Sequence, residues 1–478
     1  MSVFFALAPC AVVIVAVLFG GWSGLAAAAA SLAAMAGLVA GGAFDPPTST
    51  MLWATLADAS LLTLLVSATL VPGVIFIEAT RRLQAPQAIS HVVELLRLPK
   101  PQAAVLISLG LGVLVESLTG MGVSLLLTVP MLIQLLPRQQ AIATALVGMS
   151  LMPWGALALA GTLGATLASI DVEKFGVAIW IFSGVVAAVL PSIATAIAGG
   201  RSLADQTLAV LAGVVLWFAT GLATLLIGMP LAGVFGGLAL LAFLGSRAER
   251  SPHLLAALHA DALKPYAILI AAVTLQTLIA TALARRGMSL NISTGRVTFA
   301  VLTSPGVSLT VATLLAGWRL CDTQLVRDVA KRSWRAVATV ALFMLTARLL
   351  VASGATDALT AAIRDLGAVG ALVAVTGLGA IGGFVTGSGV TGNALFLPTA
   401  AATGAALHAK EIYAAIASAA AGHTAMASLP VAALLLAALP DRTAADDRHA
   451  LKAGLLLAGG CLIILLIVGV IWLACLPQ

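Results

Sequence analysis

Two polar clusters, far apart in the chain, contain the residues best suited to chemistry. Residues 119–124 have the sequence TGMGVS, and residues 386–391 have the sequence TGSGVT. Hydroxyl and backbone groups in such clusters can bind a small polar or anionic solute. The candidate substrate-binding residues come from the two clusters, from one position just after the second cluster and from an arginine in a separate apolar run: Thr119, Gly120, Thr386, Gly387, Ser388, Thr391, Asn393 and Arg348.

Glu116, just before the first cluster, is a candidate for proton coupling. It is the only charged residue between Lys100 and Arg138. An ionisable group deep in an apolar segment is costly and is usually functional. The alternative is a protonated carboxyl that only forms a hydrogen bond between helices. We favour the functional role, in which Glu116 carries a proton.

His423, Arg348 and Asn393 each have a structural alternative. His423, the only histidine inside a predicted span, could relay protons or contact substrate, or be a hydrogen-bonded structural imidazole. Arg348 could bind a carboxylate through two hydrogen bonds, or extend to the membrane interface. Asn393 could bind substrate, cap a helix, or do both. Asp58 lies near the start of its apolar run, where a solvated helix end is expected.

Ser388 and His423 also allow an enzyme hypothesis. A serine activated by a histidine is a nucleophile, so this pair would make an intramembrane serine hydrolase. However, Gly-Ser-Gly is a weak motif, and the first cluster has Met121 at the matched position. A channel or scaffold is a third class, with Glu116 lining a pore. The paired clusters favour transport over both, and we expect no enzyme activity.

The two clusters belong to a longer internal match. Each is followed by a proline, Pro130 or Pro398, and then by a second element, SLMP at 150–153 or SLP at 428–430. Gly, Ser and Thr at mid-membrane let a helix break, and secondary transporters use such breaks at corresponding positions of two repeats. Close helix packing is the alternative. We predict two structural repeats with broken or re-entrant helices near 116–124 and 386–393, either inverted or parallel.

The composition identifies the elements that must position these clusters. Of 478 residues, 61% are apolar and 9% are charged, whereas about a quarter of residues are charged in soluble proteins. The mean hydropathy is +1.13. We therefore predict an all-α polytopic membrane protein. Its apolar runs indicate about 12–14 transmembrane helices, because each span needs about 20 residues.

Charged loops divide and orient the chain. We expect an N-terminal transmembrane half at 1–245, a polar loop at 246–265 and a C-terminal transmembrane half at 266–478. Basic residues crowd 81–100 after the third run and 319–335 after the tenth, and the positive-inside rule places both segments in the cytoplasm. No Lys or Arg precedes Arg81, so the first run is predicted to be a retained span.

Other functional classes are not indicated. No basic stripe alternates with aromatic residues, so nucleic acid is not an expected partner despite the net charge of +6. Cys10, Cys321, Cys461 and Cys475 form no CxxC pair or metal-ligand spacing, and we expect no metal, cofactor or disulfide. The expected partners are the lipid bilayer, a small solute and protons. A homo-oligomer remains open, since 46 glycines make a dimerisation motif uninformative.

At the two clusters the chain resembles the lactate permease family of bacterial carboxylate transporters. The family pattern is EGAAGFG in the first cluster and TGSDTSSNALF in the second. Here residues 116–122 are ESLTGMG and residues 386–396 are TGSGVTGNALF. The second match is the more specific one, with Thr-Gly-Ser and Asn-Ala-Leu-Phe at the same offset. The surrounding apolar runs align in order from about Leu52 to the C-terminus.

The resemblance implies uptake of small 2-hydroxymonocarboxylates, such as lactate or glycolate, with protons, across a bacterial inner membrane. Glu116 matches the family's glutamate, and Thr386, Gly387, Ser388 and Asn393 match its second motif. Two departures are Gly389, where the family has aspartate, and residues 424–426, which lack the family's lysine. A carboxylate transporter for a different anion or coupling ion is therefore an alternative.

Overall fold

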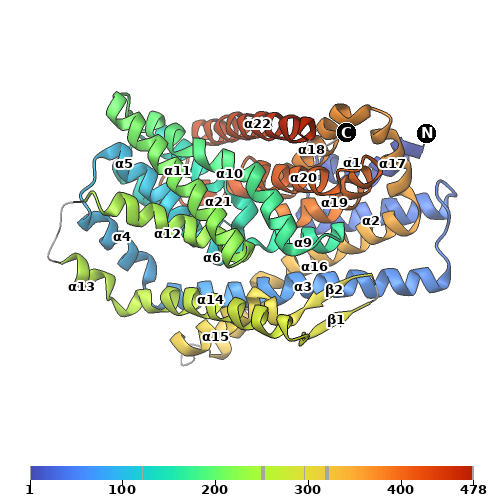
Figure 1. Cartoon of the computed structure of the whole chain (residues 1–478), viewed down its shortest axis with the longest axis horizontal. Helices are drawn as coiled ribbons and strands as arrows, with labels where there is room; N and C mark the ends of the chain where they lie inside the picture. The colour runs from blue at the N-terminus through green and yellow to red at the C-terminus, as the bar shows by residue number, and fades with distance from the viewer. Residues whose placement is uncertain (1, 121, 249–252, 295, 318–321, 476–478) are drawn as a thin grey trace.

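Helices make up almost all of the structure, a computed structural model that describes residues 2–120, 122–248, 253–294, 296–317 and 322–475 (Figure 1). Strands in these ranges are confined to β1 (Asn291–Ser293) and β2 (Thr298–Ala300), which pair as a short antiparallel hairpin. The predicted all-α polytopic membrane fold is therefore confirmed. Met121, Arg319 and Cys321 lie outside the described residues.

Nine helices of the described residues are long and apolar enough to cross a bilayer, or ten if the bent pair at 138–168 is one span. They are α3 (Ser49–Arg82), the continuous α5 (Lys100–Val105), η1 (Leu106–Leu111) and α6 (Gly112–Thr119), α10 (Val172–Ile197), α11 (Leu203–Leu226), η4 (Asp261–Leu263) with α14 (Lys264–Arg285), α16 (Thr323–Ala352), α18 (Gly367–Thr386), α20 (Lys410–Ala425) with α21 (Leu429–Ala437), and α22 (Ala444–Ala474).

This number is lower than the predicted 12–14, because several apolar runs form shorter helices. These are α1 (Ser2–Leu18), α2 (Gly24–Ala40), α7 (Val123–Leu135), η3 (Met229–Leu231) with α12 (Ala232–Gly245), and α15 (Pro305–Gly317). A 13-residue helix rises only about 20 Å, less than the bilayer core. The remaining helices are α4 (Ala85–Leu95), α8 (Arg138–Met149), η2 (Met152–Trp154), α9 (Gly155–Ala168), α13 (Leu254–Leu258), η5 (Val301–Thr303), α17 (Ala355–Arg364) and α19 (Gly389–Ala406).

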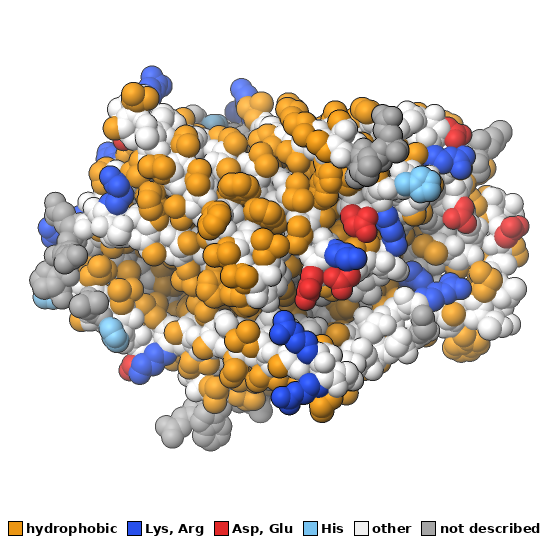
Figure 2. Space-filling view, in the orientation of Figure 1, with side chains coloured by type: hydrophobic (Ala, Val, Ile, Leu, Met, Phe, Trp, Pro, Cys, Tyr) orange, Lys and Arg blue, Asp and Glu red, His pale blue; other side chains and the backbone are white. Residues whose placement is uncertain are grey.

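The surface fits a lipid environment. Hydrophobic side chains cover most of the visible face over α10, α11 and α12, and charged side chains gather mainly at its margins and to the right (Figure 2). Along α11 the exposed side chains recur every three or four residues, as in Val214, Phe218, Leu222 and Leu225. This spacing puts an apolar stripe on one side of the helix, as expected for a lipid-facing surface.

Helices α3 and α16 run antiparallel and are joined by an ion pair at each end. Arg82 Nη1 lies 3.2 Å from Asp322 Oδ1, and Arg348 Nη2 lies 2.5 Å from Asp58 Oδ2. The two pairs are about 36 Å apart, since 24 residues of helix separate Asp58 from Arg82. Asp322 is the residue just before α16, so the C-terminal end of α3 lies beside the N-terminal end of α16. The two predicted basic segments are at these two ends, and we call this face of the protein the basic face. The Leu325 N–H, and Arg82 to a smaller extent, hold the pKa of Asp322 below its usual range.

Each polar cluster is the tip of a helical hairpin. The α5–α6 segment enters from the basic face and α7 returns to it, because Met131 and Leu135 line a small cavity together with Arg97 and Ala103. Helices α18 and α19 likewise fold back on each other: a Cβ placed on Gly382 would lie 2.9 Å from the Gly392 Cα. Both predicted breaks therefore lie at the tips of helical hairpins.

A broken helix follows each hairpin, and the two broken helices run in opposite directions. Helices α8 and α9 are separated at η2, and α20 and α21 are separated at 426–428. Arg138, at the start of α8, donates to the carbonyls of Pro440 and Asp441, just after the end of α21. Lys410 Nζ, at the start of α20, donates to the Ser169 carbonyl, just after α9 (3.2 Å). The end of each broken helix thus lies beside the start of the other.

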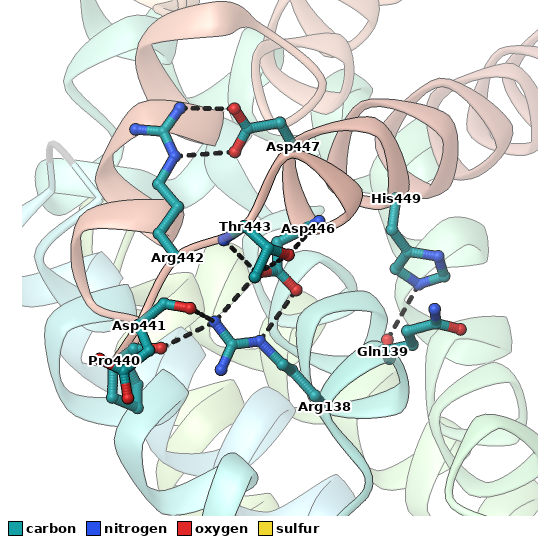
Figure 3. A network of polar contacts seen from close by, with 9 residues as sticks. All are labelled: Arg138, Gln139, Pro440, Asp441, Arg442, Thr443, Asp446, Asp447 and His449. Atoms are coloured by element: carbon teal, nitrogen blue, oxygen red, sulfur yellow. Dashed lines mark hydrogen bonds and ion pairs between the residues drawn. The ribbon is translucent and has the colours of Figure 1, made fainter.

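At the basic face, Arg138 joins the start of α8 to the loop after α21 and to the start of α22 (Figure 3). Its Nε and Nη2 each lie 2.9 Å from an oxygen of Asp446, and Nη2 also donates to the carbonyls of Pro440 and Asp441. Asp446 is 4% exposed and also caps α22 by accepting the Thr443 N–H. Beside it, Arg442 and Asp447 form a similar pair on the surface.

We expect Arg138→Met to lower the unfolding temperature, because charge-assisted hydrogen bonds to a buried carboxylate are lost. Arg442→Met is the matched control and should lower the unfolding temperature less, since its ion pair is exposed. Thermal unfolding in detergent measures both. Equal shifts in the two variants would contradict this role for Arg138.

Candidate functional site

Both hairpin tips line one central cavity of about 370 Å³. Glu116, Thr119 and Gly120 contribute from the first hairpin, and residues 386–391 contribute from the second. The remaining wall comes from α3, α9, α15, α16 and α21. The structure therefore brings together two clusters that are more than 260 residues apart in sequence.

The cavity lies midway between the two faces. On α3 it is lined by Val66, Thr69 and Leu70, and position 70 is halfway between the Asp58 and Arg82 ion pairs. On α16 it is lined by Ala336, Thr339 and Val340. A site at this depth fits the midplane binding sites of secondary transporters.

Hydroxyl groups and one carboxyl form the polar part of the cavity wall. Among the described lining residues there is no Lys, Arg or His, and Glu116 is the single acidic side chain. The polar lining side chains are Thr69, Glu116, Thr119, Thr339, Thr386, Ser388 and Thr391. Any charge on a bound anion would therefore have to be balanced by backbone groups.

Glu116 caps the N-terminus of α7 from inside the protein. Its Oε1 accepts the Gly122 N–H at 3.0 Å, and its Oε2 accepts the Ser124 hydroxyl at 2.8 Å. The side chain is 3% exposed. The helix N-terminus and these donors favour the ionised carboxylate, whereas burial favours the neutral acid.

The second tip leaves its helix N-terminus without a charged cap. Gly387, with φ 68°, ends α18 in the left-handed conformation that glycine adopts without strain. Ser388 is the N-cap of α19, and its hydroxyl accepts the Thr391 N–H at 3.5 Å. The first N–H groups of a helix have no acceptor within it, so those of Gly389 and Val390 are available at the cavity wall.

Two further helices begin at the cavity. Helix α21, capped by Ser428, places Pro430 and Val431 in the wall. Helix α9 begins with a left-handed turn at Ala156–Ala158, and Ala156 is also a lining residue. The N-termini of α19 and α21 thus lie at one cavity, beside the Glu116 carboxyl group that caps α7. Such N-termini attract anions.

The backbone conformation at position 120 and the close packing around it both require glycine. Its φ of 71° and ψ of −168° belong to a region occupied almost only by glycine, and an added Cβ would lie 2.5 Å from the Ala156 Cβ. We expect Gly120→Ala to lower the free energy of unfolding by about 2 kcal/mol or more. Gly377→Ala, where an added Cβ meets nothing within 4 Å, is the control. Equal unfolding temperatures for the two variants in detergent would contradict this assignment.

Two predicted binding residues, Arg348 and Asn393, instead hold helices together. Arg348 pairs with Asp58, which is 1% exposed and also accepts the Thr294 hydroxyl at 2.6 Å. Asp58 is therefore buried, and the expectation of a solvated helix end was wrong. The Asn393 amide donates to the Ala160 carbonyl (2.8 Å) and the Ser418 hydroxyl (2.9 Å). Neither Arg348 nor Asn393 lines the cavity.

His423 joins the two broken helices at their breaks. Its Nδ1 lies 2.5 Å from the Ser150 carbonyl oxygen, and its Nε2 lies 3.0 Å from the Ser183 hydroxyl. It is fully buried and does not line the cavity. Both ring nitrogens thus have partners other than Ser388, so the geometry gives the hydrolase hypothesis no support.

Thr69, Thr339 and Ser124 are site residues that the sequence analysis did not single out. Thr69 and Thr339 are isolated threonines in apolar helices, and nothing local distinguishes them from packing residues. Ser124 had a usable signal, because it follows the glycine pair at the expected start of a half-helix, where serine often binds a carboxylate or backbone group. No group of three His, Cys, Asp or Glu side chains in the described ranges is arranged to hold a metal ion.

The fold and the cavity define a polytopic membrane protein with a central cavity at two hairpin tips. No family model matches the chain, and no match is found among curated proteins.

Proposed function

We propose that this protein is a secondary active transporter of small monocarboxylates and that it moves them together with protons. The observation that carries the proposal is that the N-termini of α19 and α21 lie at a cavity without a basic side chain in its described lining. A carboxylate bound at α19 and α21 would complement their partial positive charge. The hydroxyls of Thr386, Ser388 and Thr391 could bond to a 2-hydroxyl group or a carboxylate oxygen.

The size of the cavity supports a small substrate. Its volume of about 370 Å³ is near the lower end of the roughly 300–1,000 Å³ range of small-molecule sites. The resemblance to lactate permeases favours lactate- or glycolate-like acids and a bacterial inner membrane. An aspartate at position 389 would crowd this wall, since a Cβ there would lie 3.3 Å from the Ala160 Cβ and 3.4 Å from the Gly422 Cα.

Glu116 provides a physical basis for proton coupling. A substrate carboxylate would share the cavity with this carboxyl group, and two unit charges 6 Å apart repel by about 3 kcal/mol at an effective dielectric constant of 20. Protonation of Glu116 removes this repulsion, so substrate and proton would bind together. A different coupling ion or anion is the alternative, because the chain departs from the family pattern at Gly389.

The opposed directions of the two broken helices support alternating access. Each unit consists of a hairpin and a broken helix, and the two units meet at the cavity and at the contact between His423 and Ser150. Transporters built from oppositely oriented units expose a fixed site to each side in turn by moving one unit against the other. The same movement is proposed here.

Ligand-induced thermal stabilisation of the purified protein tests carboxylate binding directly. We expect L-lactate or glycolate to raise the unfolding temperature in a saturable way. Lactamide has the same shape without the charge and should have no effect at the same concentration. Equal stabilisation by lactate and lactamide would contradict an anion site at the helix N-termini.

A further inference from the structure

A second cavity of about 70 Å³ lies under the β-hairpin, between α3 and α9. It is lined by Thr298, Phe299 and Ala300 of β2, by the segment that follows β2, and by Thr162 and Thr166 of α9. Thr294, at the turn of the β-hairpin, donates its hydroxyl hydrogen to Asp58. This bond connects the hairpin to α3 at the Asp58–Arg348 ion pair. The cavity is thus enclosed by the hairpin and by two helices that also line the central cavity.

The second cavity adjoins the central one on the side of the face opposite the basic face. Thr69 and Leu159 belong to the walls of both cavities. From there the second cavity extends along α9 past Thr166 to Val172, the first residue of α10. It therefore reaches from mid-membrane to the end of α9 that lies near Lys410 and away from Arg138.

The hydroxyl groups around this cavity are arranged to accept hydrogen bonds. Thr162, Thr166 and Thr303 each donate to a backbone carbonyl at 3.1 Å, which leaves their oxygen lone pairs for other partners. The hydroxyls of Thr69 and Ser304 are buried and have no hydrogen-bond partner. Leaving two such groups unpaired costs about 1–3 kcal/mol each.

Water molecules in the cavity would supply the missing hydrogen bonds. A cavity of roughly 15 Å³ on the same measure holds one water molecule, so a 70 Å³ cavity holds several. Waters there could donate to the threonine oxygens and accept from Thr69 and Ser304. A chain of such waters would end at the central cavity, into which Glu116 faces.

We propose that the cavity under the hairpin is a water-filled passage and that protons reach the central cavity and Glu116 through it from the face opposite the basic face. Thr69, at the junction of the two cavities, positions the water that connects them. The hydration of the passage is independent of the transported substrate, whereas its use by protons rests on the proposed proton symport.

Silver-ion reactivity of introduced thiols tests the hydration in the full-length protein. Ser304→Cys and Thr69→Cys replace the two unpaired hydroxyls, after Cys10, Cys321, Cys461 and Cys475 have been changed to serine or alanine. Thr144→Cys is the matched control, since its hydroxyl is equally buried and unpaired but lines neither cavity. Silver ions added to the bulk solution react only with thiols that water can reach, and mass spectrometry measures the thiol that remains.

We expect the Ser304→Cys and Thr69→Cys variants to react at least tenfold faster than the Thr144→Cys variant, because thiol reactivity needs the hydrated thiolate. Rates equal to that of the control would overturn the passage. Both substitutions are close in size to the native residue, and detergent unfolding temperatures within the range of the parent protein verify the fold.

The proton route has its own test. Ser304→Ala removes an unpaired hydroxyl that lines the second cavity but not the central one, and we expect it to slow proton-driven lactate uptake into proteoliposomes about tenfold. Exchange of internal for external lactate, which needs no net proton entry, should be unchanged, and Thr144→Val should change neither. Rapid labelling at position 304 combined with normal uptake by Ser304→Ala would overturn the proton route. Absence of uptake by the parent protein would refute the proposed function and leave the labelling result standing.

Discussion

Replacing Glu116 by glutamine is expected to remove proton-driven uptake and to preserve exchange of substrate across the membrane. Glutamine has the same shape, and its carbonyl oxygen can still accept the Gly122 N–H. Its amide can donate to Ser124 in place of the native bond in the other direction. The hairpin tip should therefore fold, but the side chain no longer binds or releases a proton.

Proteoliposomes with an inward proton gradient measure this effect. We expect the initial rate of labelled lactate uptake to fall by at least 100-fold in the Glu116→Gln variant, the usual scale for loss of a proton-transferring group. Glu94→Gln, an exposed glutamate on the basic face, is the matched control and should behave as the parent protein. Parent-like, gradient-dependent uptake by the Glu116→Gln variant would mean that Glu116 only caps α7.

The second large effect concerns the buried ion pair between Asp58 and Arg348. Removing either partner leaves the other charge buried without compensation, which costs about 3–5 kcal/mol. Asp58→Asn and Arg348→Met should therefore each sharply lower the unfolding temperature in detergent. In the Asp58→Asn variant the Thr294 hydroxyl also loses its charged acceptor, so the β-hairpin should become more accessible to proteases.

A double-mutant cycle separates the pair from its surroundings. The Asp58→Asn/Arg348→Met protein should be more stable than the sum of the two single effects predicts, because no unpaired charge remains. Thr339→Val, on the same helix as Arg348 but at the cavity wall, is the control and should leave stability nearly unchanged. Additive effects would contradict a direct interaction between Asp58 and Arg348.

The sequence alone was sufficient to find the two hairpin tips. Glycine, serine and threonine clusters in over-long apolar runs predicted breaks at 116–124 and 386–393, and both clusters line the central cavity. The reason is local: a broken helix needs residues that tolerate unusual backbone conformations, and these residues are visible in any sequence. Gly120, Gly122 and Gly387 all have positive φ.

Long-range partners could not be found in this way. Arg348 was a candidate ligand because nothing in the sequence links it to Asp58, which is 290 residues away. Asn393 and His423 are similar cases, since their hydrogen bonds reach Ala160 and Ser150 in the other unit. A polar residue in a membrane segment signals that a partner exists, but the packing of helices decides whether that partner is protein or substrate.

The direction of the two units and the number of spans also depended on tertiary structure. Half-helices such as α7 are as apolar as full spans, so composition did not distinguish the two kinds of helix. The sequence therefore did not show whether the number of spans between the two clusters is odd or even. The contacts of Arg138 with Asp446 and of Lys410 with Ser169 fix the direction that periodicity left open.

Accumulation of labelled L-lactate or glycolate in proteoliposomes of the parent protein tests the central claim most directly. With an inward proton gradient and no substrate gradient, we predict that the internal concentration rises above the external one and that the lumen acidifies in proportion. Collapse of the proton gradient by an ionophore should return the substrate to equal concentrations. Accumulation that is absent, or that is unchanged when the proton gradient is removed, would contradict proton-coupled carboxylate transport by this cavity.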